Sequence, residues 1–278
     1  MRSAPRPTRR TARWAFGRVA GGFVSAVLCC ACTTLPRAGT PRAPAVLPSA
    51  EHLARLLRDR RAAVQSLRAL AHLHYRDPHE SSSSREALIV DRPDRVRVEV
   101  LSVFGSLFVL TAENGAIAAY ARQEDTVYRG RASSENLSRY ARLWMPIPDL
   151  VDLVLGTPPM RPSAQERVTF DSQMGAVRWW RALDRGAQVV WFSDKALPVA
   201  AEELGSDGSA RWQATYAAYE QHEEVPIATQ IRFELPTQER VLDLTLDDVD
   251  INPALDESVF DLQVPPGSKV INIDTVAN

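Results

Sequence analysis

From residue 67 onward, the chain consists mostly of short segments in which apolar and polar residues alternate. Within 94–101, for example, Val96, Val98 and Val100 alternate with Arg95 and Glu99. This period of two is typical of half-buried antiparallel strands. Short turns separate the segments, and an Asn-Gly pair at 114–115 is a strong signal for one tight hairpin. The pattern predicts eleven or twelve strands, at 67–75, 85–90, 94–101, 107–112, 117–121, 126–128, 176–182, 188–192, 198–204, 210–219, 227–235 and 241–251.

Helical spacing appears first at residues 50–65. Leu53, Leu56, Leu57 and Val64 recur there at helical intervals among arginines, after a Pro-Ser start signal. We therefore expect one amphipathic helix to open the folded region.

A second helical region spans 133–157 and contains two predicted helices. Ser133 or Ser134 can cap the first, and Pro148 suits the first turn of the second. On that second helix the apolar residues share one face, so Asp149 and Asp152 are expected to point away from it.

These elements together predict a mainly β protein with three helices. A large sheet with one apolar face needs a cover, and the helices are the elements available to provide it. We therefore expect the helices to lie in the concave face of one curved antiparallel sheet. If they fill that face only in part, a hydrophobic cavity remains beside the core.

The first 31 residues differ from the rest of the chain. Six arginines and no acid occupy residues 1–18, and a 13-residue apolar run follows. Because a membrane helix needs roughly 20 apolar residues, this run fits a cleaved export signal better. All three cysteines of the chain lie at its end, within Leu28-Cys29-Cys30-Ala31-Cys32-Thr33.

That cysteine cluster resembles a bacterial lipobox, in which a small residue precedes the lipidated cysteine. Ala31 makes Cys32 the first candidate for lipidation, and Cys30 is the second. The alternative is an ordinary signal peptide whose cysteines pack as hydrophobic residues. Thr33 after Cys32, rather than Asp, implies an outer-membrane destination by resemblance to the enterobacterial sorting rules.

The formal net charge of −1 averages over unlike segments. Without the first 31 residues, 27 of the 33 basic residues remain against 34 acidic ones, so the mature protein is acidic. This balance excludes a basic groove for nucleic acid. We expect a signal peptide at 1–31, a proline-rich tether at 32–48 and a single β-domain at 49–278.

Residues 97–157 also carry a family resemblance. The ordered motifs Arg97-Val-Glu-Val-Leu-Ser-Val-Phe-Gly-Ser106, an Asn-Gly turn, a helix, Met145-Pro-Ile-Pro148 and Leu155-Gly-Thr-Pro-Pro159 resemble the LolB-like outer-membrane lipoprotein receptors. The segment 256–267 resembles the closing segment of the LolA-like carriers. Both therefore indicate the LolA/LolB lipoprotein-localisation superfamily.

The resemblance implies an unclosed antiparallel β-barrel covered by a helical lid. It further implies a periplasm-facing, lipid-anchored receptor that takes lipoprotein acyl chains from a soluble LolA-like carrier and passes them to the inner leaflet of the outer membrane. Residues that can form the lid or line the cavity are Leu137, Tyr140, Trp144, Ile147, Leu150, Val151, Val154, Trp179, Trp191 and Trp212. The strand tryptophans can equally belong to the ordinary core.

The same resemblance places a membrane-insertion loop at Val103, Phe104 and Gly105. Ser102 before the pair and Gly105-Ser106 after it favour a turn with an exposed tip, although a buried aromatic residue at a strand end is the alternative. Phe104 stands where the enterobacterial receptors have Leu, and Val103 where they have Pro.

Signals for catalysis or metal binding are weak. No nucleophile elbow, Walker or Rossmann spacing occurs, and we interpret Ser81–Ser84 as a polar hairpin loop. His72 and His74 have ligand-like spacing, and Asp243, Asp247, Asp248 and Asp250 form an acidic run, but solvated strand faces explain both groups. We expect no enzyme, metal or cofactor. The alternative function is a cell-envelope sensor or structural module of the same fold that binds a partner.

Overall fold

The computed structural model describes residues 42–140, 145–222 and 224–275. Its core element is a sheet of 14 strands in the order β14-β6-β5-β4-β3-β2-β1-β13-β12-β11-β10-β9-β8-β7. The strands are β1 (Ser66–Arg76), β2 (Ser81–Asp91), β3 (Arg95–Ser102), β4 (Gly105–Glu113), β5 (Ala116–Ala121), β6 (Thr126–Arg131), β7 (Glu166–Asp171), β8 (Ala176–Leu183), β9 (Gly186–Phe192), β10 (Pro198–Leu204), β11 (Ala210–His222), β12 (Val225–Leu235), β13 (Arg240–Ile251) and β14 (Lys269–Asn272). Because β14 and β7 have no common ladder, the sheet is an unclosed barrel.

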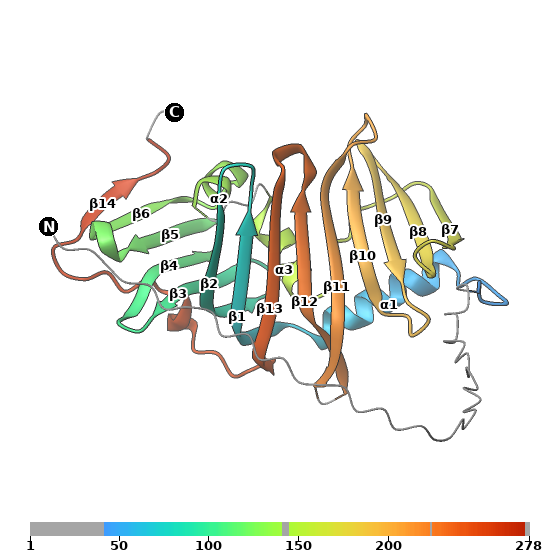
Figure 1. Ribbon diagram of the computed structural model, residues 1–278, viewed down its shortest axis with the longest axis horizontal. Helices are drawn as coiled ribbons and strands as arrows, with labels where there is room; N and C mark the ends of the chain where they lie inside the picture. The colour runs from blue at the N-terminus through green and yellow to red at the C-terminus, as the bar shows by residue number, and fades with distance from the viewer. Residues whose placement is uncertain (1–41, 141–144, 223, 276–278) are drawn as a thin grey trace, which may run out of the picture. The chain divides into compact units, whose positions relative to one another are not determined.

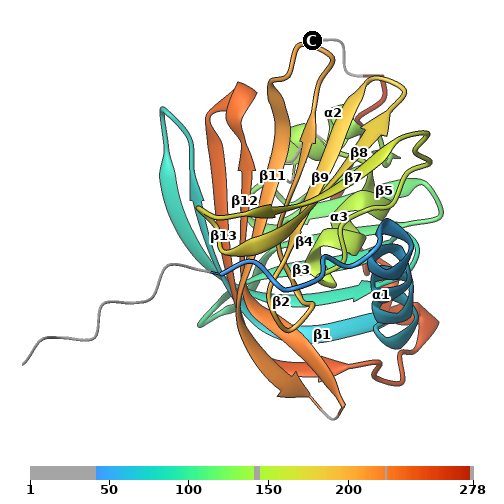
Figure 2. The same cartoon turned by 90° about the vertical axis from the view of Figure 1, so that its right-hand side faces the viewer.

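Three α-helices and three short 3-10 turns complete the described fold. They are α1 (Ala50–Ala63), α2 (Ser134–Tyr140), α3 (Ile147–Val154), η1 (Arg122–Glu124), η2 (Pro236–Gln238) and η3 (Glu257–Phe260). Figures 1 and 2 show α1 and α3 on one face of the sheet, within its curve. The predicted mainly β fold with a helical cover is thus confirmed.

The sequence explains where the helices begin. The Ser49 side chain accepts a hydrogen bond from the backbone N–H of His52 and so caps α1. Ser133 does the same for the Asn136 N–H at the start of α2. On α1, Leu53 and Leu57 are fully buried in the main core, as their spacing predicts.

The strand count differs from the prediction of eleven or twelve. The two missed strands, β7 and β14, are the two edges of the sheet. β14 has only four residues and pairs with β6 in parallel, so one ladder of the sheet is not antiparallel. An edge strand has one neighbour only, and its short sequence carries little alternation for a pattern to reveal.

The serine run 81–84 is also not a hairpin loop. It is the first part of β2 and pairs with β1 up to Arg76↔Ser81. Polar side chains there obscured the strand, because alternation is visible only where one face is apolar.

Candidate functional site

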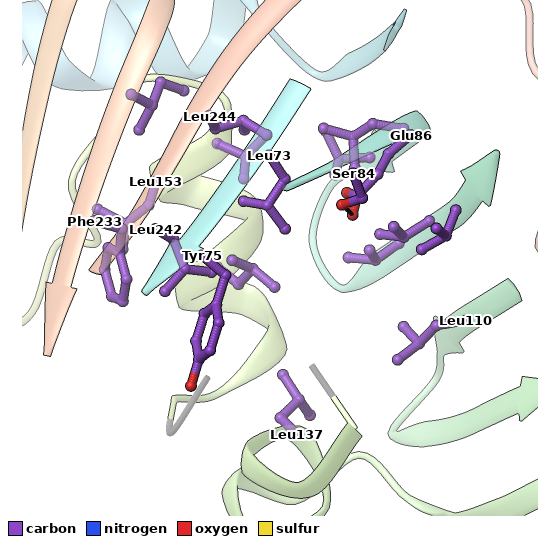
Figure 3. A pocket seen from close by; sticks show the side chains of 18 of the residues that line it. Leu73, Tyr75, Ser84, Glu86, Leu110, Leu137, Leu153, Phe233, Leu242 and Leu244 are labelled. Carbon is purple, nitrogen blue, oxygen red and sulfur yellow. Dashed lines mark hydrogen bonds between the residues drawn. The ribbon is translucent and has the colours of Figure 1, made fainter. Parts of the chain in front are cut away.

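A cavity of about 290 Å³ lies between the sheet and the lid helices α2 and α3. Its walls are formed by side chains from β1, β2, β3, β4, β12, β13, α2 and α3, most of which Figure 3 shows. Its lining residues are Leu73, Tyr75, Ser82, Ser84, Glu86, Leu88, Val90, Val96, Val98, Val100, Phe108, Leu110, Leu137, Ile147, Leu150, Leu153, Val154, Ile231, Phe233, Leu242 and Leu244. Almost all of these side chains are apolar.

Alternation along neighbouring strands produces this wall. Val96, Val98 and Val100 of β3 share one face, and the ladder places Glu86 opposite Val100 and Leu88 opposite Val98. The same rule brings Leu242 and Leu244 of β13 to the cavity. The wall is therefore a continuous patch on the concave face of the sheet.

Apart from the Tyr75 hydroxyl of β1, which donates to Asp77, the polar part of the wall lies on β2. Ser82 is exposed, Ser84 is half-buried and Glu86 is 7% exposed, so the polar side chains run from solvent into the cavity. The Ser84 hydroxyl donates to Glu86 Oε1 at 2.8 Å. Burial raises the pKa of the Glu86 carboxyl, and this hydrogen bond offsets part of the rise.

Helix α3 is buried on more than its apolar face. Ile147, Leu150 and Val154 line the cavity, while Val151 is fully buried in the core. Asp149 and Asp152, which were expected to point away, are also buried. The helix lies between the sheet and other elements, so its polar side has no access to water and needs charged partners instead.

Asp152 has those partners. Its carboxylate pairs with Arg92, in the turn between β2 and β3, and with Arg61 of α1. Arg92 also donates to the Val64 carbonyl at 2.9 Å and to the Thr157 hydroxyl at 2.6 Å. Burial lowers the pKa of Arg92 to about 10, so it remains a cation at neutral pH. These bonds hold α3 to α1 and to the sheet.

A second ion-pair group holds the other end of α3. Arg161 pairs with Asp149 and, at 3.4 Å, with Glu203, which also binds Arg211 at 3.2 Å. These four residues line a polar pocket of about 440 Å³. Its charges are balanced and already paired within the chain.

The hairpin between β3 and β4 carries the exposed pair Val103 and Phe104, whose exposed fractions are 93% and 85%. Gly105 follows with a positive φ of 99°, which closes the turn. The Ser102 hydroxyl donates to the Gly105 carbonyl at 2.7 Å, and Arg122 donates to the Phe104 carbonyl at 2.7 Å. The backbone of this tip is thus fixed while both apolar side chains face solvent.

The structure places four of the candidate lid residues against the cavity, namely Leu137, Ile147, Leu150 and Val154. The tryptophans lie elsewhere. Trp179 is fully buried in the core, Trp212 stacks on Phe233 and lines the polar pocket, and Trp191 belongs to a separate cluster with Val189 and Ala200. Cys30, Cys32, Trp144 and the Tyr140 side chain lie outside the described residues.

Sequence reasoning missed most of the cavity wall. Its residues belong to β1–β4, β12 and β13, whereas the aromatic residues drew attention to β8, β9 and β11. The available signal was the aliphatic alternation of β2 and β3, which predicts a covered face but does not distinguish core from cavity.

No group of three or more His, Cys, Asp or Glu residues in the described part of the chain is arranged to hold a metal. His72 and Asp247 are both exposed, with Nε2 and Oδ2 3.5 Å apart. No helix within the described ranges is long and apolar enough to cross a membrane.

No family model and no curated protein matches the sequence, but solved structures do match the fold. A domain assigned to an outer membrane lipoprotein-sorting protein of Vibrio parahaemolyticus is 16% identical, with a TM-score of 0.53 over 77% of this chain and 97% of that one. A LolA superfamily protein of Nitrosomonas europaea is 12% identical, with a TM-score of 0.51 over 78% and 98%. The chain shares the overall fold of these two proteins. A DUF1329 family protein of Desulfovibrio piger is also similar, at 12% identity and a TM-score of 0.52 over 76% and 96%.

Replacing Asp152 by Asn tests the anchoring of α3. The substitution leaves the Arg92 guanidinium, 5% exposed, without its counter-charge. We expect the free energy of unfolding in urea to fall by about 3 to 5 kcal/mol, as for other broken buried pairs. Glu51→Gln breaks the exposed pair with Arg55 and is the control that should change stability little. Equal effects of the two variants would contradict the anchoring role.

Glu86→Gln tests the burial of the carboxyl. Folding raises the pKa of the Glu86 carboxyl above its ordinary value of 4.5. As the pH rises past 4.5, the unfolded chain therefore loses the carboxyl proton before the folded chain does. The wild type then loses stability with rising pH, and the neutral Gln does not. We expect the stability of Glu86→Gln relative to the wild type to grow from pH 4.5 upward, measured by denaturation at several pH values. Parallel curves for the two proteins would refute this.

Proposed function

We propose that the protein is a lipid-anchored outer-membrane receptor that binds the acyl chains of lipoproteins in the cavity between the sheet and α3 and passes them to the membrane. The main support for the proposal is the apolar wall of the cavity, in which aliphatic and aromatic side chains enclose a space that the helices do not fill. A site of this composition suits a hydrocarbon chain, and its lining residues are not arranged as a set of catalytic groups.

The size of the cavity supports binding that can be reversed. Its volume of about 290 Å³ is at the lower end of the ~300–1,000 Å³ usual for ligand pockets, so one partly enclosed chain fits better than several. Each buried methylene contributes about 0.8 kcal/mol, and ten of them about 8 kcal/mol before the cost of association. A carrier that must also release its cargo needs such a moderate affinity.

The route of release follows from the strand order. The β1–β2 turn and the β3–β4 turn lie at the same end of the strands, because β1 to β4 are consecutive antiparallel neighbours. The exposed tip Val103-Phe104 therefore follows the end of the β2–β3 ladder, beyond which the two hairpins diverge (Figure 1). In the proposed function this tip enters the inner leaflet of the outer membrane, close to the emerging chain.

The remaining parts of the proposal concern how the protein is anchored to the membrane and how lipoproteins reach it. Cys32, or Cys30, receives the lipid, and residues 33–48 tether the domain to the periplasmic side of the outer membrane. A soluble LolA-like carrier delivers the lipoproteins. The acidic balance of the mature chain is consistent with a partner that presents positive charge.

Filling the cavity tests the binding site. Val100 is a half-buried lining residue, and Val100→Trp places an indole where the acyl chain of the ligand is expected to bind. We expect native mass spectrometry of the full-length protein purified from membranes to show bound lipid or lipoprotein in the wild type and at least tenfold less in the variant.

Val199→Trp is the matched control, because Val199 is equally half-buried but belongs to the cluster around Trp191. It should bind as the wild type does. A wild-type protein with no bound lipid and no uptake of a solvatochromic dye would remove the carrier function and leave a partner-binding module of the same fold.

Phe104→Glu tests the tip. Because Phe104 is 85% exposed, its loss should change neither the fold nor cargo uptake. We expect incorporation of a lipidated cargo into vesicles to slow about tenfold or more, since burial of a phenyl group in the bilayer contributes about 2 kcal/mol. Met174→Glu, at the exposed turn between β7 and β8, is the control. Unchanged incorporation by Phe104→Glu would refute the role of the tip.

A further inference from the structure

Three polar side chains of the cavity wall share one strand, while the Tyr75 hydroxyl on β1 already donates to Asp77. Ser82, Ser84 and Glu86 are at alternate positions of β2, so all three face the cavity. Further along the same face, Leu88 and Val90 are buried in its deep part. The strand therefore presents a gradient from exposed hydroxyl to buried carboxyl to hydrocarbon.

Glu86 has few partners for a buried carboxyl. Its neighbours across the two ladders are Ala71 of β1 and Val100 of β3, neither of which carries a charge. Its hydrogen bond comes from Ser84, and no basic side chain in the described ranges forms an ion pair with it. A carboxyl group offers more hydrogen-bonding positions than this one bond uses, and no oxygen of Glu86 is both fully enclosed and without a partner, so the remaining positions are accessible to a ligand or to water.

The sheet divides at this residue. The ladder between β2 and β3 ends at Glu86↔Val100, while the rest of β2 continues with β1 alone and the end of β3 continues with β4 alone. Figure 1 shows the two strands diverging beyond this point. Glu86 and Ser84, which are hydrogen-bonded to each other, lie side by side in the cavity wall where this ladder ends (Figure 3).

We propose that Ser82, Ser84 and Glu86 form a polar subsite for the ester or amide group that joins an acyl chain to its head group. The acyl chain then extends past Leu88 and Val90, and the head group of the ligand leaves the cavity between β2 and β3. This inference rests on the proposed function and adds to it the depth and direction in which the ligand is held.

The chemistry favours a neutral linkage over a cationic head group. Two hydroxyls and one carboxyl offer donors and acceptors of the kind that ester carbonyls and amide N–H groups need. Burial in an apolar wall favours the uncharged carboxyl, which can donate to a carbonyl oxygen. A cation drawn to this depth would lose its hydration for a single pairing, which is costly in a site without further partners.

The test compares two ligands on one variant. The first is a synthetic lipopeptide with a diacylglyceryl cysteine, and the second is diphenylhexatriene, a hydrocarbon without polar atoms. We expect Glu86→Leu to weaken binding of the lipopeptide about tenfold, as for the loss of one buried hydrogen bond, and to leave binding of the hydrocarbon unchanged or tighter. A leucine side chain at this position fits an apolar wall, and the half-buried Ser84 hydroxyl can turn to water, so this variant is expected to fold.

Glu86→Gln separates hydrogen bonding from charge. It keeps a donor and an acceptor at the same place, so we expect its affinity for the lipopeptide to stay within about threefold of the wild type. A loss as large as that of Glu86→Leu would overturn the neutral linkage in favour of a cationic head group. Equal weakening of both ligands by Glu86→Leu, or no change with either, would overturn the subsite. A wild-type protein that binds neither ligand would instead refute the proposed function.

Discussion

The ion pairs of Asp152 determine where α3 lies, and the cavity depends on that position. Arg92 comes from the sheet and Arg61 from α1, so one carboxylate joins three elements that are distant in sequence. With α3 fixed inside the curve, its apolar residues cover part of the concave face and leave the patch between β1 and β4 uncovered. Because these charges are buried, removing one partner leaves the others without compensation, which makes the arrangement sensitive to a single substitution.

The sheet contributes a second constraint, which is its division between β2 and β3. An unclosed barrel has two free edges, and here the ladder between β2 and β3 also ends early, at Glu86↔Val100. The polar side chains of β2 lie at and beyond this point, and the exposed Val103-Phe104 tip lies at the same end of the strands. In the proposed function, the ligand leaves the cavity past these strand ends.

Local patterns predicted the secondary structure well and the cavity poorly. The alternation of β3 and the cap at Ser49 lie in short stretches of sequence, and both appear in the structure. The edge strands β7 and β14 are short, the serine start of β2 lacks an apolar face, and all three were missed. Asp149 and Asp152 look like solvent-facing residues of an amphipathic helix, but their partners Arg161 and Arg92 are supplied by other elements. The strand tryptophans Trp179, Trp191 and Trp212 were the largest apolar side chains available, yet all three are buried outside the cavity lining.

By itself, the sequence determined the fold class: a period of two repeated along the chain builds a large sheet, and the helical segments supply its cover. It also identified the Val103-Phe104 turn, since a Ser before and a Gly-Ser after the pair specify a tight hairpin. Only the tertiary structure decided which apolar face remains partly uncovered and which polar residues face it. Those features depend on how far α3 enters the curve and on where β2 leaves β3. The position of α3 results from contacts with Arg61 and Arg92, which are far from it in the chain, and neither feature is encoded in a local pattern.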